Sequence, residues 1–93
     1  MFQKNNSRVK IVCAACKLDD LIVCGARHYD KMMNIQIEAC GRTGWPKAEQ
    51  GFIDQFGNFY SRVEAYNIIE RNKLQVIDKN NGSKVELYSE GLY

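Results

Sequence analysis

The chain has 93 residues, with thirteen basic and eleven acidic side chains, a formal net charge of +2 and 45% hydrophobic residues. This length and composition are typical of one globular domain and rule out an intrinsically disordered chain. The charge is too small for a protein that wraps long nucleic acid, although a few well-placed arginines suffice for a small anion. The first ten residues lack the apolar run of a signal peptide, and no stretch is long enough to span a membrane, so we expect a cytoplasmic protein.

Two apolar runs near the N-terminus, residues 8–18 and 21–27, predict a pair of antiparallel strands. The polar pair Asp19-Asp20 between them is a suitable two-residue turn. Both runs are almost continuously apolar, which is typical of strands covered on both faces, or on one face by helices and on the other by a partner chain. Because a domain of this size buries little surface by itself, we expect a homo-oligomer, a dimer or larger.

A helix is predicted over residues 28–40, because apolar residues recur there at helical spacing. Asp30 in its first turn suits the helix dipole, and Gly41 after it suits a left-handed stop. One stripe of this helix is formed by Tyr29, Met33, Ile37 and Cys40.

Residues 42–50 read as a loop, followed by a strand over 51–55 and a turn over 56–59. Ser61 and Glu64 have the spacing of a capping box, which predicts a second helix that begins there and runs to about Arg71. Asn72 is a suitable left-handed stop for this helix.

The turn dipeptide Asn81-Gly82 lies between residues 74–77 and 84–88, which predicts a terminal hairpin, with 89–93 as a short tail. The predicted order is β-β-α-β-α-β-β. We therefore expect a single α+β domain over residues 1–93, with a mostly antiparallel sheet and two helices.

The four cysteines raise the possibility of a metal or redox site. Cys13 and Cys16 have the spacing of half a zinc site, but Cys24 and Cys40 are isolated, and residues three apart on a strand point to opposite faces. A thioredoxin-like pair would begin a helix instead of lying inside a strand. Free cysteine is a common small core residue. We expect no metal, no cofactor and no disulfide, with a metal or redox role as the alternative.

An enzyme has no specific support in the sequence. His28 is the only histidine, which excludes a multi-histidine metal site and suits a cap or a ligand contact better than a general base. No Gly-rich phosphate loop, nucleophile elbow or paired-carboxylate motif is present. We expect a protein that binds without catalysis.

Arg27 and Arg62 each lie where a strand turns into a helix, and backbone N–H groups at such a junction favour an anion. A guanidinium grips phosphate with two parallel hydrogen bonds, and the nearby rings of Phe52 and Phe56 provide flat faces for a base. A site that binds a nucleotide needs both kinds of contact, hydrogen bonds to the phosphate and an aromatic surface on which the base can stack. The alternative is that the rings are core and the arginines are solvated.

Three segments carry a resemblance to a known family: GARHYD at 25–30, QGFIDQFGNFYSRVEA at 50–65 and LYSEGLY at 87–93. They resemble the first type of Thoeris anti-defence protein. The resemblance implies a phage protein that binds cyclic ADP-ribose isomers, the alarm signal of a bacterial defence system, and sequesters them without cleaving them. It also implies assembly as dimers or larger oligomers, and some members hold cyclic di- or trinucleotides of the related CBASS defence.

On this basis the sequence suggests seven ligand-binding residues, in which the arginines would hold pyrophosphate, Phe52 or Phe56 would stack the adenine, and Asp54 or Asn58 would contact ribose hydroxyls or base edges. They are Arg27, His28, Phe52, Asp54, Phe56, Asn58 and Arg62. The partner is then a cyclic nucleotide-type molecule in an infected bacterial cell, with no membrane and no long nucleic acid. The alternative is a phage inhibitor or adaptor whose rings form a protein-binding patch, and a third possibility is a small structural zinc module.

Overall fold

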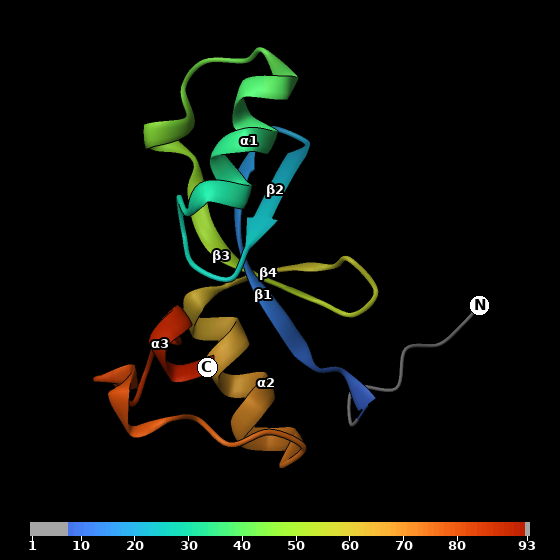
Figure 1. Cartoon of the computed structure of the whole chain (residues 1–93). Helices are drawn as coiled ribbons and strands as arrows, with labels where there is room; N and C mark the ends of the chain where they lie inside the picture. Colours follow the sequence, from blue (N-terminus) through green and yellow to red (C-terminus); the bar gives the residue numbers. More distant parts are fainter. Residues whose placement is uncertain (1–7, 93) are drawn as a thin grey trace, which may run out of the picture.

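A computed structural model describes residues 8–92; residues 1–7 and 93 lie outside this part. One antiparallel sheet has the strand order β2-β1-β3-β4, with two main helices beside it (Figure 1). The strands are β1 (Ile11–Leu18), β2 (Leu21–Gly25), β3 (Glu49–Asp54) and β4 (Phe59–Ser61), and the helices are α1 (Lys31–Cys40) and α2 (Arg62–Asn72). Short helical segments are η2 (Trp45–Lys47), η3 (Lys79–Asn81) and α3 (Ser89–Leu92). The predicted α+β class is confirmed, and no helix in residues 8–92 is long and apolar enough to cross a membrane.

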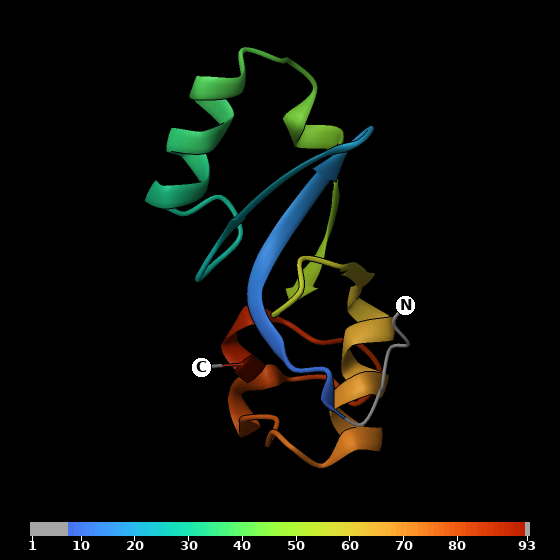
Figure 2. The ribbon, with the colours of Figure 1, turned by 90° about the vertical axis from the view of Figure 1, so that its right-hand side faces the viewer.

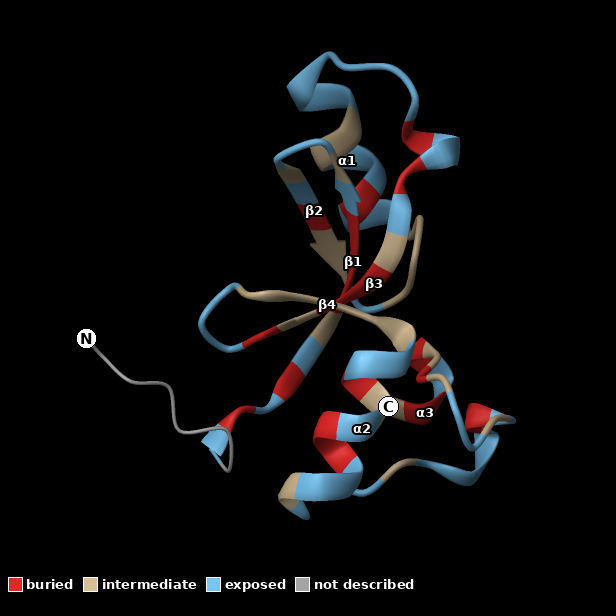
Figure 3. Ribbon diagram, turned by 180° about the vertical axis from the view of Figure 1, so that it is seen from behind, coloured by how far each residue is buried: buried red, intermediate tan, exposed pale blue. Residues whose placement is uncertain are grey.

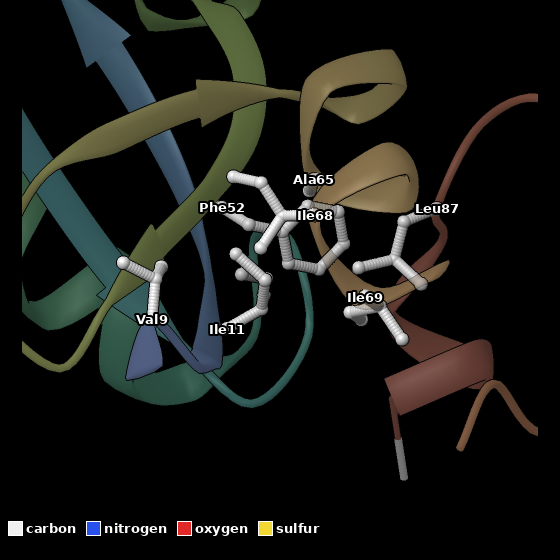
Figure 4. Packing of buried hydrophobic residues seen from close by; sticks show 8 residues of the cluster. Val9, Ile11, Phe52, Ala65, Ile68, Ile69 and Leu87 are labelled. Carbon is white, nitrogen blue, oxygen red and sulfur yellow. The ribbon is translucent and has the colours of Figure 1, made fainter. Parts of the chain in front are cut away.

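The core lies along one face of β1, because side chains alternate between the two faces of a strand. Ala14 packs with Phe52 of β3 and with the buried stripe of α2, together with Val9, Ile11 and Leu87 (Figure 4). Two residues further along β1, Cys16 packs in a second cluster with Met33 of α1 and with Val23, Trp45 and Ala48. The two helices therefore lie toward opposite ends of the strands, as Figure 2 shows.

The opposite face of the sheet carries residues that belong to neither core cluster: Cys13, Ala15, Cys24, Ile53 and Phe59. Gly51 belongs to this face, and a Cβ there would come within 2.7 Å of Cζ of Phe59. Glycine at this position therefore lets the Phe59 ring lie against the sheet. On the neighbouring strand β2, Ile22 is 39% exposed.

Helix α1 begins three residues later than the sequence predicted, so the expected start at His28 is wrong. Asp30 is the N-cap, and its carboxylate accepts hydrogen bonds from the backbone N–H of Met33 at 2.9 Å and of Arg27 at 3.1 Å. Tyr29 has a φ of +58°, which is outside the helical region. The predicted stop at Gly41 is confirmed, with a φ of +68°.

Helix α2 begins as predicted and ends one residue later. Ser61 Oγ accepts the N–H of Glu64 at 3.1 Å, and Glu64 Oε1 accepts the N–H of Ser61 at 2.9 Å, which confirms the capping box. The left-handed stop is Lys73, not Asn72. Asn72 stays helical, and its side chain donates to the carbonyl of Val9 at 2.9 Å.

The strand β4 was not predicted, because its three residues are too few to show a periodic pattern. It forms a hairpin with β3, in which Phe52 lies opposite Tyr60. The element order of the sheet and main helices is therefore β-β-α-β-β-α.

The predicted C-terminal hairpin is wrong: in residues 74–88 the structure has η3 and irregular backbone. The cause is the buried side chain of Asn81, which donates to the carbonyls of Ser83 and Glu86 and accepts the N–H of Tyr88. Two of these backbone groups, on Glu86 and Tyr88, lie in the strand predicted over 84–88, where they would otherwise be available for pairing with 74–77. A side chain that competes for backbone hydrogen bonds thus replaces the hairpin with a compact loop.

Glutamine side chains take the place of neighbouring strands along the edges of the fold. Gln36 of α1 bonds both the N–H and the C=O of Cys24 on the edge strand β2. Gln75 bonds the N–H and the C=O of Ile11 in the same way. These amides satisfy backbone groups that would otherwise be open to pairing with another chain.

Candidate functional site

Arg62 is the residue with the most unusual surroundings among the predicted site residues. It is half-buried at the first position of α2, and its Nη2 donates to Oε1 of Gln50 at 2.6 Å. Its Cζ lies 5.1 Å from the ring centroid of Tyr88, a cation–π contact. Its Nε is buried without a hydrogen-bond partner. Within residues 8–92 the one ion pair is Arg42 with Asp19, so Arg62 forms no ion pair with a carboxylate of this part.

Arg27 and His28 come from the loop between β2 and α1. Arg27 Nη1 donates to the carbonyl of Ser89 at 2.9 Å, which joins this loop to α3. His28 Nε2 lies 2.8 Å from the carbonyl of Gly51, and its ring meets the ring of Phe52 edge to face, with centroids 5.4 Å apart. Figures 1 and 2 both show this loop beside α3.

The structure brings these three predicted residues to one place, the arginine corner, which we define as Arg27, His28, Gln50, Arg62 and Tyr88. The side chain of Arg27 donates a hydrogen bond to the carbonyl of Ser89, the residue after Tyr88. The ring of Tyr88 lies under the guanidinium of Arg62. Gln50, whose side chain accepts a hydrogen bond from Arg62, is followed by Gly51, whose carbonyl is hydrogen-bonded to His28. The corner therefore holds two guanidinium groups, one imidazole, one amide and one aromatic ring, contributed by four separate segments.

The charge state of His28 follows from this position. Burial lowers the pKa of its imidazole, and the nearby positive charge of Arg62 lowers it further, while the hydrogen bond to the carbonyl of Gly51 acts in the opposite direction. The net pKa is below the ordinary value, so the imidazole is neutral at pH 7. The positive charge of the corner at that pH is carried by the two arginines.

The remaining four predicted residues lie on the β3–β4 hairpin and not in the corner. Phe52 is fully buried in the core, so its faces are occupied by neighbouring side chains. Phe56 is 67% exposed at the hairpin tip, where it lines a different hollow. Asp54 and Asn58 bond to each other inside the hairpin, between the Asn58 amide and the carboxylate at 3.1 Å.

Asp54 is 1% exposed, and its carboxylate accepts four hydrogen bonds. The donors are the backbone N–H groups of Phe56 and Asn58, the Asn58 amide and the Tyr60 hydroxyl. Burial raises the pKa of this carboxyl, but the hydrogen bonds outweigh burial and the net pKa is lowered. The geometry gives Asp54 a structural role in the turn.

Sequence reasoning missed two members of the corner. Gln50 was assigned to a loop, and Tyr88 to a strand of the terminal hairpin. The only sequence signal for Tyr88 is that it lies inside the segment Leu87–Tyr93, which carries part of the resemblance. Nothing in the sequence distinguishes Gln50 from the other glutamines, because its contact with Arg62 depends on the position of β3 beside the start of α2.

The four cysteines are free and do not form one cluster: the side chains of Cys13 and Cys24 are neighbours that interact with each other, whereas Cys16 and Cys40 lie elsewhere. Cys16 is buried in the second core cluster and Cys13 lies on the opposite face of β1, as their spacing predicted. Cys24 is half-buried and Cys40 is exposed. In the part of the chain that the structure describes, no three His, Cys, Asp or Glu side chains are grouped so that they could hold a metal ion.

These features describe a small α+β domain with a half-buried cationic corner beside a neutral histidine. A model of the family described as phage T4 y16D protein matches residues 10–93. The chain therefore belongs to this family and is a phage-type protein. No curated protein and no solved structure matches it.

Proposed function

We propose that this protein binds a small, anionic, nucleotide-like signal at the arginine corner and sequesters it during phage infection. The observation that carries the proposal is the half-buried guanidinium of Arg62, which has a buried Nε without a partner and no carboxylate counter-ion in residues 8–92. A buried charge is costly unless it is paired. A bound anion would supply the missing partner.

The chemistry of the corner favours a pyrophosphate with an aromatic base. Two guanidinium groups share a doubly charged group better than one, and each forms charge-assisted hydrogen bonds to phosphate oxygens. Tyr88 supplies the aromatic ring that sequence reasoning assigned to Phe52 or Phe56. The resemblance of the corner-forming segments to Thoeris anti-defence proteins favours a cyclic ADP-ribose isomer, with cyclic di- or trinucleotides as related ligands.

We expect binding without cleavage. The Nε2 of His28 is engaged with the carbonyl of Gly51 at 2.8 Å, so this nitrogen is already occupied in the structure. The expected readout is that bound ligand, released by heat, has its original mass. Appearance of a hydrolysed product in step with protein concentration would make the protein an enzyme instead.

We also propose that the protein acts as a homo-oligomer. The sheet face formed by Cys13, Ala15, Cys24, Ile53 and Phe59 belongs to neither core cluster, and Ile22 on β2 is 39% exposed. This face also carries Lys17, whose Nζ lies 5.8 Å from the centroid of the Phe59 ring, and Ala15 on it is already buried. A second copy is a fitting cover for its partly exposed apolar side chains. The resemblance to oligomeric anti-defence proteins supports the same assembly.

The test is calorimetric titration of the protein with cyclic ADP-ribose isomers and with cyclic dinucleotides. Arg62→Ala should bind about ten- to a hundredfold more weakly, the equivalent of about 1.5–3 kcal/mol for a hydrogen bond to a charged group. Arg42→Ala is the matched control, since Arg42 is paired with Asp19 on the surface. Absence of binding to every one of these ligands would refute the proposal, and an unchanged affinity of Arg62→Ala would place the ligand elsewhere.

A further inference from the structure

The tip of the β3–β4 hairpin presents an aromatic ring to solvent on a firmly held turn. Phe56 is 67% exposed, and Figure 3 shows the tip in the colour of exposed residues. Its backbone N–H donates to Asp54 Oδ1 at 2.8 Å, and the backbone of Asp54 also bonds Gly57 and Asn58. The Asp54 carboxylate inside this turn is buried and accepts four hydrogen bonds, so the backbone that carries the Phe56 ring is fixed by the fold.

Two cations lie next to this ring. Arg8 and Lys10 are both exposed and flank Val9, which is buried in the first core cluster. Gln55 fastens this segment to the hairpin: its Oε1 accepts the N–H of Lys10 at 2.8 Å, and its Nε2 donates to the carbonyl of Arg8 at 2.8 Å. One side chain thus fixes the backbone of both basic residues beside the aromatic tip.

These residues surround one open hollow of about 730 Å³ together with Leu74, which is 47% exposed. Its lining is Arg8, Lys10, Gln55, Phe56 and Leu74. The lining contains two cations, no carboxylate, one exposed ring and one exposed aliphatic side chain. It shares no residue with the arginine corner.

We propose that this hollow is a second site, which binds a short stretch of single-stranded nucleic acid. A base stacks on Phe56, with its edge against Leu74, while Arg8 and Lys10 neutralise the phosphates on either side of it. An aromatic platform next to backbone-tracking cations is the general means by which proteins hold single strands without sequence preference. The modest net charge of the chain is compatible with this, because two phosphate contacts suffice for a weak site.

A membrane surface or a protein partner fits this hollow less well. The hollow offers one exposed ring, Phe56, and one exposed aliphatic side chain, Leu74, beside two cations, whereas a lipid-inserting element buries a larger apolar face. An apolar protein patch would be expected to lack charge at its centre. The lining instead combines two apolar side chains with two cations whose backbone is bonded to Gln55.

The experiment is fluorescence anisotropy of the full chain with labelled oligothymidylate and oligouridylate of about ten nucleotides, a length in the range that single-strand-binding domains cover. Parallel arms use the same length of DNA duplex and vesicles of phosphatidylserine. Both single strands should bind better than the duplex. The logarithm of the affinity should fall with the logarithm of salt concentration with a slope of about −1.4, as for two phosphates of a single strand.

Variants separate stacking from charge. Phe56→Ala should weaken binding by roughly five- to a hundredfold with an unchanged salt slope, the range for loss of one stacked base. Lys10→Ala should reduce the magnitude of the slope by about 0.7. Val85→Ala and Lys84→Ala are the matched controls, because both residues are exposed and lie outside the hollow. Arg62→Ala should leave this binding intact, which separates the hollow from the arginine corner.

Three outcomes overturn the proposal: no binding of either single strand at low salt, equal binding of the duplex, or equal affinity of Phe56→Ala and wild type. Vesicle binding that is lost in Phe56→Ala, without binding of oligonucleotides, would assign the hollow to a lipid surface instead. Thermal melts of each variant distinguish lost binding from lost folding.

Discussion

Replacing Asp54 by asparagine removes the charge from the carboxylate that organises the β3–β4 turn while keeping its shape. Four donors meet this group, at 2.8 to 3.1 Å. A hydrogen bond to a charged acceptor contributes about 1 kcal/mol more than one to a neutral acceptor. Asparagine keeps one oxygen, which can still accept two of these bonds, and places an NH2 donor where the other two donors point. The loss is therefore about 3–4 kcal/mol or more, a large part of the roughly 5–14 kcal/mol expected for a domain of this length.

Thermal unfolding measures this loss directly. For a domain of this size each kcal/mol lowers Tm by about 4–8 °C, so Asp54→Asn should melt roughly 12–30 °C below wild type. Tyr60→Phe is the graded control, because it removes one of the four donors and should cost about 1.5 kcal/mol. The two variants therefore test whether the effect scales with the number of bonds.

The pH dependence gives an independent check with a definite sign. The folded-state pKa of Asp54 is lowered, so its contribution is present above the unfolded pKa of about 3.9 and is lost as pH falls from there toward the folded value. Wild type should therefore lose stability more steeply than Asp54→Asn below about pH 4. If Asp54→Asn melts within a few degrees of wild type and loses ligand affinity instead, Asp54 is a ligand contact and the structural argument fails.

Four further predictions concern the helix cap, the sheet face and the thiols. Ser61→Ala should cost about 1 kcal/mol in thermal melts through the lost cap, with ligand affinity unchanged, and an unchanged Tm would contradict it. Light scattering should show an oligomer at tens of micromolar that Ile53→Lys converts to monomer, and a wild-type monomer would refute the assembly. Burial raises the pKa of Cys13 to about 12, so iodoacetamide at pH 8 should label the exposed Cys40 first and leave Cys13 and the buried Cys16 unmodified; faster labelling of Cys13 would contradict this. Cys16→Ser should cost stability only, and zinc that copurifies with the protein and is needed for its folding would overturn that expectation.

The sequence by itself determined the features that depend on residues close together in the chain. The β1–β2 hairpin at Asp19-Asp20, the capping box of Ser61 and Glu64 and the stop at Gly41 are all set within a few positions of each other. Their hydrogen bonds close small rings of backbone and side chain, so local chemistry decides them.

Tertiary structure decided where the predicted site residues lie. Phe52 and Phe56 are alike in sequence, but β1 and α2 bury the first and the turn around Asp54 exposes the second. Tyr88 reaches the arginine corner because Asn81 folds its segment into a loop instead of a hairpin. Burial and side-chain competition for backbone groups depend on segments distant in sequence, and no local pattern records which segments will meet.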